Sequence, residues 1–409
     1  MRILWLSHWF PYPPDNGARL RTYHLMRHLA RRHEVALLAF AERPPEPSHR
    51  EALASVCRVL GVWPRPPFRR RSLRSVAGYL APMPRYLVDT YSPAMAQAVA
   101  HQVQTGWPQA IVASEISPAT GMSRYALEVS GIPRIAEDLE MLAFQDGRRR
   151  ARGLRQRLSW ELRWWKATHY IRRLLRTFAG YTVASQEERD CLTRIAPSAP
   201  APAIVPNGVD VAAFEGDFGP PEPDTLVFAG ALSFHLNFEA MAYFLAEVYP
   251  RILARRPGVT LRITGRTEGV PLHRLPRRPG VVFTGYVEDV RPVVARSRVS
   301  IAPLLRGGGT RLKVLEAMAL GTPVVATSKG AEGIEAEPGR DLWIADDPAA
   351  FAEAVLRLLE DDGLYRRLRE NGRRLVRERY DWRIIGRRFD DFLTACVEGG
   401  GDDGGDGRW

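Results

Sequence analysis

Cysteine is scarce in this sequence, and long apolar runs are lacking. The three cysteines, Cys57, Cys191 and Cys396, lie far apart in the 409 residues and show no metal-ligand spacing. This excludes a disulfide-stabilised scaffold and favours a reducing compartment. No apolar run reaches the 18 residues typical of a membrane-spanning helix, and the apolar start at residues 1–10 is too short for a signal peptide. A cytoplasmic protein is therefore expected.

Lysine is also scarce, although the chain is basic. Only three of the 58 basic residues are lysines, against 46 acidic residues, and the formal net charge is +12. Such an excess can indicate a nucleic acid or an acidic membrane surface as partner. An arginine bias of this extent is more typical of genome composition, and no nucleic-acid recognition motif is present. We therefore predict no nucleic-acid partner, but note that residues 65–74 and 148–176 carry much of the excess.

Short β-rich runs alternate with longer stretches of helical periodicity, which indicates parallel sheets covered by helices on both faces. A Pro/Ala-rich stretch at 196–203 and the turn dipeptide Asn207-Gly208 interrupt the alternation, which then restarts. The strands expected before this break are 2–7, 34–40, 109–114, 133–137 and 180–184, with a first helix at 19–31. Those expected after it are 225–230, 259–265, 281–285, 299–303, 323–327 and 342–345, with helices at 237–256 and 310–320.

This pattern predicts two α/β domains joined by a hinge. The predicted parts are one α/β domain at 1–203, a second at 204–382, a helix at 383–398 and a disordered Gly/Asp-rich tail at 399–409. The cleft between two such domains is the default place for a ligand.

The segment that begins with Gly307, Gly308 and Gly309 is the most informative for chemistry. It follows an expected strand and opens an expected helix, with Thr310 predicted as the N-cap. Glycines let the backbone approach a ligand closely, and the N–H groups of a first helical turn favour an anion. Arg311 and Lys313 add positive charge, so a diphosphate would fit here.

Glu316 lies further along the same helix, where an acid would suit ribose hydroxyls rather than phosphate. A second interpretation stays open. The three glycines would then form a flexible loop, and Glu316 would be a surface residue beside Lys313.

These motifs resemble those of the retaining, nucleotide-sugar-dependent glycosyltransferases of family 4, also called group 1. The resemblance covers about 390 residues and implies the α/β fold called GT-B, in which two Rossmann-like domains face each other across an interdomain cleft. It implies that 1–203 is the acceptor-side domain, that 204–382 is the nucleotide-sugar-binding domain, and that the helix at 383–398 returns to the first domain. The segments that carry it are the loop at 7–21, the motifs at 205–210, 228–230 and 285–287, and the block at 307–327.

The resemblance also implies roles for single residues. Glu316 matches an acid that binds the nucleotide ribose. Gly309, Thr310 and Arg311 match the backbone that binds the donor diphosphate. Tyr286 and Val287 match the residues that flank the nucleobase. Asn16 and Gly17 match the loop that faces the sugar and the phosphate.

Two departures from the family pattern occur. Gly308 stands eight residues before Glu316, where relatives have an acid that approaches the transferred sugar. The basic residues that many relatives carry after the strand at 226–230 are missing, and we expect Arg311 and Lys313 to supply that charge. We interpret both as marks of a subgroup with a Gly-Gly-Gly-Thr-Arg-Leu-Lys signature.

Other candidates lie after expected strands, at the carboxyl edge where α/β sites form. Glu115, at a position where many relatives have a histidine facing the donor sugar, is a candidate for sugar contact, with a loop acid or a helix-start charge as the alternative. Asp138 is a candidate for sugar or acceptor contact, with a solvated turn acid as the alternative. His8 shares the same edge. Asn237 is expected to cap its helix, with donor contact as the alternative, and Arg19 and Arg21 are expected to be helix-surface charges.

The segment 148–178 combines arginines with an aromatic helical face. Trp160, Trp164, Ala167, Ile171, Leu175 and Phe178 share one face, and Arg155, Arg163, Lys166 and Arg173 lie mostly opposite. Packing of the tryptophans against the sheet is one interpretation, and peripheral contact with an anionic membrane on the inner face of the cell membrane is the other. Arg69, Arg70 and Arg71 form a second, weaker candidate for lipid contact.

We therefore predict a glycosyltransferase that moves a sugar from a nucleoside diphosphate sugar to an acceptor hydroxyl with retention of configuration. The acceptor could be a saccharide, a lipid-linked molecule or a small molecule, as in glycan, glycolipid or glycosylated-metabolite biosynthesis. No cofactor or metal is expected, because the paired aspartates are adjacent rather than spaced as Asp-x-Asp after a strand. The alternatives are a non-catalytic relative that binds a nucleotide or an anionic polymer, and a nucleotide-sugar epimerase.

Overall fold

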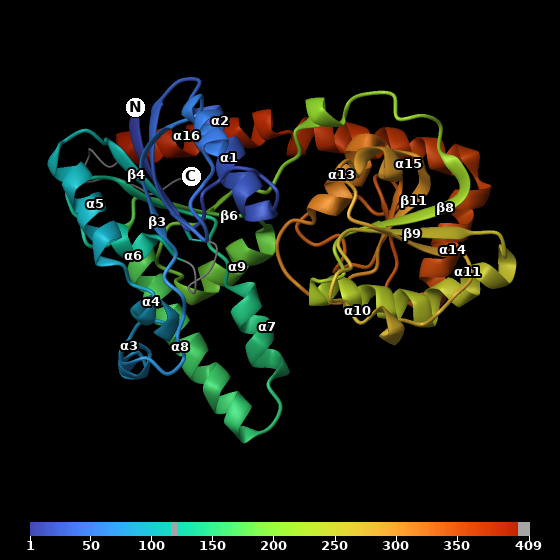
Figure 1. Ribbon diagram of the computed structural model, residues 1–409, viewed down its shortest axis with the longest axis horizontal. Helices are drawn as coiled ribbons and strands as arrows, with labels where there is room; N and C mark the ends of the chain where they lie inside the picture. The colour runs from blue at the N-terminus through green and yellow to red at the C-terminus, as the bar shows by residue number, and fades with distance from the viewer. Residues whose placement is uncertain (116–120, 400–409) are drawn as a thin grey trace. The chain divides into compact units, whose positions relative to one another are not determined.

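A computed structural model describes residues 1–115 and 121–399 of the chain. It contains two compact units, the first formed by Met1–Asn207 together with the chain from Ile385 onward, and the second by Gly208–Ile384. Each unit has its own sheet and helices (Figure 1). Of the predicted tail, Gly399 is the last residue of a helix, and the remainder lies outside the described residues.

The first unit is built on a parallel sheet with strand order β3-β2-β1-β4-β5-β6-β7. β1 is central, and Trp5 lies between Leu37 of β2 and Val112 of β4. The edge strands β3 and β7 were not predicted. The strands are β1 (Arg2–Ser7), β2 (Glu34–Ala41), β3 (Arg58–Pro64), β4 (Ala110–Ser114), β5 (Arg134–Glu137), β6 (Gly180–Val183) and β7 (Ala203–Ile204).

Helices connect the strands of this sheet and cover it. α8 has a mixed environment: its later turns pack Ala167, Ile171 and Leu175 into the core as predicted, whereas Lys166 is buried and not on a polar face. The helices are α1 (Gly17–Leu29), α2 (Pro47–Ala54), α3 (Leu73–Ala77), α4 (Arg85–Asp89), α5 (Pro93–Gln104), α6 (Ser123–Ala126), α7 (Leu142–Arg150), α8 (Leu154–Thr177), α9 (Gln186–Ile195) and α16 (Trp382–Gly399).

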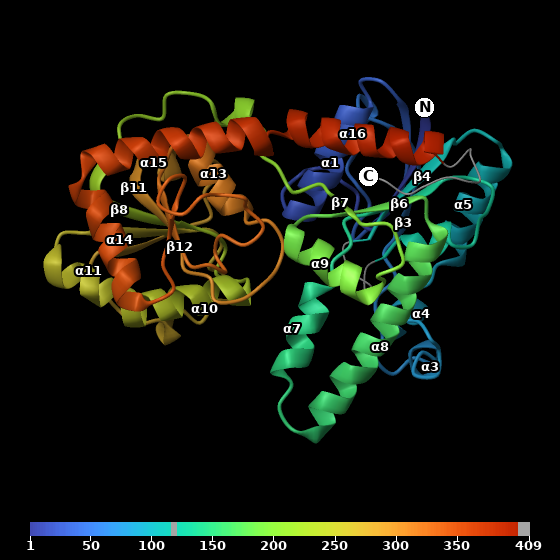
Figure 2. The same cartoon turned by 180° about the vertical axis from the view of Figure 1, so that it is seen from behind.

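The last helix, α16, packs its later turns on the first unit (Figure 2). Phe389 meets Trp5 with ring centroids 5.8 Å apart. The buried carboxylate of Asp390 lies 2.6 Å from Nε2 of His33 and accepts a hydrogen bond from Arg32 at 3.1 Å. The end of the chain is therefore part of the first unit's packing.

The second unit has a parallel sheet with order β10-β9-β8-β11-β12-β13. Its strands alternate between two cores, as the two-residue period of a strand requires. Leu226 and Phe228 face one core and Val227 faces the other. The strands are β8 (Glu222–Ala229), β9 (Thr260–Thr264), β10 (Val281–Gly285), β11 (Ser297–Ala302), β12 (Val324–Ala326) and β13 (Trp343–Ile344).

The helices of the second unit include one departure from expectation. The single helix expected at 237–256 is divided by a π-helical turn at Phe244–Val248, next to Pro250, which has no N–H to donate to the helical ladder. The helices are α10 (His235–Tyr243), α11 (Tyr249–Arg255), α12 (Arg291–Ala295), α13 (Leu312–Leu320), α14 (Pro348–Glu360) and α15 (Asp362–Leu375). Among the described residues, no helix is both long and apolar enough to cross a membrane.

Candidate functional site

The glycine-rich segment lies between β11 and α13, as the sequence predicts. Gly307 and Gly309 have positive φ angles of 103° and 79°, a region that favours glycine. The helix begins at Leu312 with Arg311 at the N-cap, so the prediction that Thr310 is the cap is wrong. Thr310 is buried instead, and its carbonyl accepts a hydrogen bond from Leu312 N at 3.1 Å.

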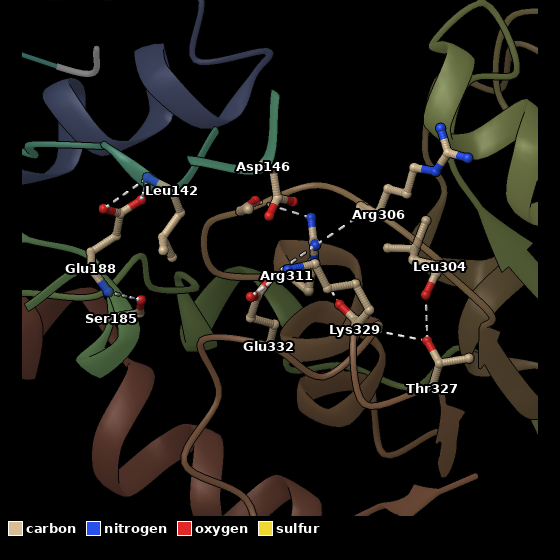
Figure 3. A network of polar contacts seen from close by, with 12 residues as sticks. Leu142, Asp146, Ser185, Glu188, Leu304, Arg306, Arg311, Thr327, Lys329 and Glu332 are labelled. Carbon is tan, nitrogen blue, oxygen red and sulfur yellow. Dashed lines mark hydrogen bonds and ion pairs between the residues drawn. The ribbon is translucent and has the colours of Figure 1, made fainter. Parts of the chain in front are cut away.

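Arg311 stabilises the loop that precedes it. Its guanidinium donates to the carbonyls of Gly308 at 3.0 Å, Lys329 at 3.2 Å and Arg306 at 3.5 Å (Figure 3). It also lies 3.4 Å from the carboxylate of Glu332, which pairs with the Lys329 ammonium at 2.6 Å. The positive charge of Arg311 is thus held at the base of the glycine-rich loop.

The loop after β12 supports the same region. Thr327 donates its hydroxyl to the Leu304 carbonyl at 2.5 Å, which joins the loops after β11 and β12 (Figure 3). Gly333, with a φ of +77°, packs against the backbone of Thr310, and a Cβ there would lie 3.1 Å from the Thr310 Cα. The backbone of the glycine-rich segment is therefore held from both sides.

Lys313, in the first turn of α13, reaches back to β8 and α10. Its ammonium donates to the side-chain oxygen of Asn237 at 2.8 Å and lies 4.2 Å from the ring centroid of Phe228. Asn237 is the third residue of α10, whose N-cap is Phe234, so its predicted capping role is wrong. A Cβ on Gly230 would lie 2.6 Å from the ammonium, which explains the glycine in the Phe-Ala-Gly motif.

The environment of Lys313 and Glu316 changes the protonation of both. Burial lowers the pKa of Lys313 to about 7, with a further lowering by the charge of Arg311 and an opposing effect from Glu316. Burial raises the pKa of Glu316, and Lys313 opposes that shift. Glu316 is partly buried on α13, and so is not the exposed surface residue of the alternative interpretation.

The predicted nucleobase segment follows β10. Tyr286 is 62% exposed, and the guanidinium of Arg266 lies 5.2 Å from its ring centroid. Val287 is partly buried. Arg266 follows β9 after Gly265, and Tyr286 follows β10. The two exposed residues therefore lie at the carboxyl ends of neighbouring strands. Sequence reasoning missed Arg266, which its place directly after an expected strand could have revealed.

A second group of polar residues lies in the first unit. Asn16 is the N-cap of α1, and its side-chain oxygen accepts from Arg19 N at 3.1 Å, while Gly17 is the first residue of the helix. Arg19 is a partly exposed helix charge as predicted, 2.9 Å from Asp15.

Arg21 contradicts its prediction as a surface charge, because its side chain is only 1% exposed. It donates to Glu137 at the end of β5, lies 3.4 Å from Asp138, and donates to Asn207 at 3.2 Å. Its spacing of four residues from Leu25, on the apolar face of α1, was the signal for burial.

Asp138 is held in an unusual conformation beside Arg21. Its φ is +63°, which is rare for a residue other than glycine, and its N–H donates to the Thr182 hydroxyl at 3.0 Å. One carboxylate oxygen, Oδ1, is buried without a hydrogen-bond partner. Burial raises the pKa of Asp138 and of Glu137, and Arg21 opposes both shifts.

Glu115 is buried after β4. One oxygen accepts from Ser123 N at 2.9 Å, whereas Oε1 is buried without a hydrogen-bond partner. Burial raises the pKa of Glu115 to about 7. His8, after β1, is also buried, and burial followed by the charges of Arg65 and Arg124 lowers its pKa to about 3, so its ring is neutral. Glu115 is thus not a loop acid in solvent, and its bond from Ser123 N places it at the start of α6, as the helix-start alternative expects.

Each described pair of adjacent aspartates has at least one member with a structural partner, and Asp402 and Asp403 lie outside the described residues. Asp346 accepts from Ser328 N and from its hydroxyl at 2.8 and 2.6 Å, and Asp347 caps α14. Asp361 caps α15, and Asp390 binds His33. Within the residues described, no group of three or more histidine, cysteine, aspartate and glutamate side chains could hold a metal ion.

Comparison with known proteins supports the resemblance. Residues 223–361 match the family model described as Glycosyl transferases group 1. A phosphatidyl-myo-inositol mannosyltransferase of Mycolicibacterium smegmatis is 33% identical over 195 residues, which cover 44% of this chain and 48% of the relative. An MMP alpha-(1->4)-mannosyltransferase of Mycolicibacterium hassiacum is 28% identical over 233 residues, or 54% and 56% of the two chains. The match thus spans about half the length of these relatives.

Solved structures confirm the predicted fold class. Anabaena HepE in complex with UDP superposes with a TM-score of 0.66 at 15% identity and covers 97% of this chain and 100% of that one. The glycosyltransferase WaaG, involved in lipopolysaccharide biosynthesis, gives a TM-score of 0.62 at 13% identity over 96% and 99% of the two chains. The α/β architecture with two parallel sheets is that of GT-B glycosyltransferases.

We predict that Glu115→Gln makes the protein less sensitive to rising pH. The folded-state pKa of Glu115 is raised to about 7 from 4.5, so its contribution to stability is complete below pH 4.5 and is lost as the pH rises through 7. Wild type should therefore lose roughly 3 kcal/mol of stability relative to Glu115→Gln between pH 5 and pH 8. Urea unfolding at both values measures this, with exposed Glu187→Gln as the control. Equal changes in the free energy of unfolding of wild type and Glu115→Gln between the two pH values would contradict this prediction.

We predict that Arg21→Met destabilises the protein by about 3–5 kcal/mol at pH 8, because Glu137 and Asp138 would be left buried without their cation. The loss should be smaller at pH 5 than at pH 8, because burial raises the pKa of both carboxyls and the missing Arg21 charge no longer opposes that shift. Thermal unfolding of Arg21→Met and of the half-exposed control Arg19→Met measures both effects. A loss that does not depend on pH would show that the cavity, and not the charge, determines the result.

Proposed function

We propose that this chain is a glycosyltransferase that moves a sugar from a nucleoside diphosphate sugar to an acceptor hydroxyl, with retention of configuration and without a metal. The observation that carries the proposal is the second unit's match to group 1 glycosyl transferases, together with Lys313 and Glu316 on the first turns of α13 behind a glycine-rich loop. The relatives and the UDP complex that the comparisons found support it.

The donor diphosphate binds at the N-terminus of α13. Helix N–H groups and backbone N–H groups of Gly309, Thr310 and Arg311 suit an anion, and the positive φ angles of the loop glycines allow close approach. Arg311 holds the loop through three carbonyls, so its proposed catalytic contribution includes fixing those N–H groups as well as charge. Such preorganised donors stabilise charge as the diphosphate departs.

Lys313 and Glu316 make two further donor contacts, the first to the diphosphate charge and the second to ribose hydroxyls. Asn237 holds Lys313 in place, and burial lowers the pKa of Lys313 to about 7, so a bound diphosphate would keep it protonated. Glu316 accepts hydrogen bonds from the ribose hydroxyls. Tyr286 and Val287 flank the base, and the Arg266 guanidinium over Tyr286 belongs to the same edge.

The first unit supplies the acceptor side and the sugar contacts. Asp138 and Glu115 each have a buried oxygen without a partner, which suits a hydroxyl donor. In the proposed reaction the bond from the anomeric carbon to the diphosphate oxygen breaks as a bond to the acceptor oxygen forms on the same face. The acceptor proton passes to the departing phosphate oxygen. Asn16 and Gly17 remain proposed contacts of sugar and phosphate, at the start of α1.

The acceptor is proposed to be a saccharide, a lipid-linked molecule or a small molecule, in glycan, glycolipid or glycosylated-metabolite biosynthesis. The mannosyltransferase relatives include one named for phosphatidyl-myo-inositol, which supports a lipid-linked acceptor. We also propose peripheral contact with the inner face of the cell membrane through 148–178.

We predict that one nucleoside diphosphate raises the melting temperature of wild type without added metal and has no effect on Glu316→Ala. Ligand at 100 times its Kd adds about 2.7 kcal/mol to apparent stability, which is a shift of several degrees. UDP, GDP, ADP and TDP are compared by thermal unfolding, with the half-exposed Glu353→Ala on α14 as the control. Sugar release from the matching donor then separates transfer from binding alone. Equal shifts in wild type and Glu316→Ala would contradict the ribose role.

We predict that Lys313 makes nucleotide binding weaken as the pH rises. Its pKa of about 7 leaves it charged at pH 6 and mostly neutral at pH 8, whereas a bound diphosphate favours the charged form. The affinity advantage of wild type over Lys313→Met should fall about tenfold between pH 6 and pH 8. Titration calorimetry measures both proteins, and the nucleotide's own titration is common to them. A constant advantage would place the phosphate elsewhere.

A further inference from the structure

Exposed large apolar side chains of the first unit are confined, among its described residues, to two segments. One segment is α3 with the turn after it, and the other is the first half of α8. Leu80 is 94% exposed and Leu73 is 90% exposed, values found for residues with almost no protein contact. We call this set the apolar crest, and it consists of Leu73, Val76, Tyr79, Leu80, Leu154, Leu158, Leu162 and Trp165.

The α8 part of the crest is one face of a helix. Leu154, Leu158, Leu162 and Trp165 follow one another at spacings of four, four and three residues, which places them in a single stripe. The predicted core face of this helix is a different one, and it is buried only from Ala167 onward. The first half of α8 therefore has an apolar stripe that no other described part of the chain covers.

The two parts of the crest are joined rigidly. The buried ammonium of Lys166 on α8 donates to the carbonyls of Gly78 and Tyr79 at 2.5 and 2.7 Å. Arg85 donates to the Ser75 carbonyl at 2.7 Å and to the Tyr79 hydroxyl at 2.6 Å. Figures 1 and 2 both show α3 beside α8, where the α7–α8 hairpin extends beyond the sheet of the first unit.

The start of the hairpin is also fixed. The carboxylate of Glu188 on α9 accepts from Met141 N at 2.8 Å and Leu142 N at 3.0 Å, at the beginning of α7 (Figure 3). Gly147 of α7 packs against the Trp160 ring of α8, which a Cβ would displace.

Exposed arginines surround the crest. They precede and follow its apolar residues in both segments, and the acids nearby are few: Glu161 pairs with Arg148, and Asp146 with Arg150. The exposed arginines are Arg69, Arg70, Arg71 and Arg74 beside α3, and Arg148, Arg149, Arg150, Arg152, Arg155, Arg157 and Arg163 on the hairpin.

We propose that the apolar crest inserts into the interfacial region of a bilayer that contains anionic phospholipid, with the surrounding arginines on the lipid phosphates. This deepens the peripheral contact proposed above, because it assigns α3 to the contact and names the lipid chemistry. Leucine and tryptophan side chains enter the acyl boundary, and guanidinium groups pair with phosphate at headgroup level. A nucleic acid would bind the arginines but would leave the leucines exposed. A protein partner is less suitable, because the centres of protein interfaces are depleted of charge.

The test is sedimentation of the full chain with vesicles of roughly 70% phosphatidylcholine and 30% phosphatidylglycerol, and with phosphatidylcholine alone. Wild type should pellet with the anionic vesicles and bind the neutral ones much more weakly. The triple variant Leu73→Ser, Leu80→Ser, Leu158→Ser should lose at least tenfold in partition coefficient. Exposed Val282→Ser on β10 is its control. Arg70→Gln with Arg71→Gln should lose roughly fivefold per arginine, with Arg366→Gln and Arg367→Gln on α15 as the matched charge control.

Several outcomes would overturn the proposal. These are no binding of wild type to anionic vesicles, equal binding by the triple variant, or equal losses in the two arginine pairs. Self-association that the triple variant abolishes, without vesicle binding, would assign the crest to a second copy of the chain. Vesicle binding needs no nucleotide, so failure of the donor site leaves this result intact. Nucleotide-induced shifts in melting temperature should be the same in the crest variants as in wild type, which also shows that they fold.

Discussion

The Lys313 ammonium lies in a setting made by three separate elements. It donates to the side-chain oxygen of Asn237 on α10, faces the Phe228 ring of β8 and packs where Gly230 has no side chain. Because a desolvated cation is unfavourable unless it is compensated, this arrangement requires each of those residues. It also joins the end of β8, the start of α10 and the start of α13, and the glycine-rich loop precedes the last of these. The geometry proposed for donor binding depends on that connection.

Much of the architecture could be predicted because parallel strands buried on both faces leave continuous apolar runs. Both sheets, the break near Asn207 and the glycine-rich loop before α13 follow from such patterns. The strands that escaped prediction are at sheet edges: β3 (Arg58–Pro64) is only half-buried and contains Gly61 and Pro64, so neither its composition nor its periodicity is typical of a buried strand.

The errors in the site concern polar side chains whose partners are distant in sequence. Arg21 and Lys166 look like surface charges, yet each is buried because acceptors on other elements surround it: Glu137 and Asn207 for the first, and the carbonyls of Gly78 and Tyr79 for the second. Asn237 was predicted to cap its helix, because the local sequence does not show that its partner is Lys313, which is 76 residues away. Local patterns carry no information about such partners, whereas spacing on a helix face did indicate that Arg21 shares a side with Leu25.

The order of the two units along the chain determines which of them can fold first during synthesis. The first unit is discontinuous: its sheet comes from the start of the chain, but Phe389 and Asp390 of α16 reach it only after all of Gly208–Ile384 has been made. On the ribosome, Trp5 and His33 are therefore made well before their partners on α16, whereas the second unit has every strand of its sheet by that point. The second unit can therefore complete its folding first. Loss of the later turns of α16 would destabilise the first unit, whose sheet is made earliest, before it destabilises the second unit.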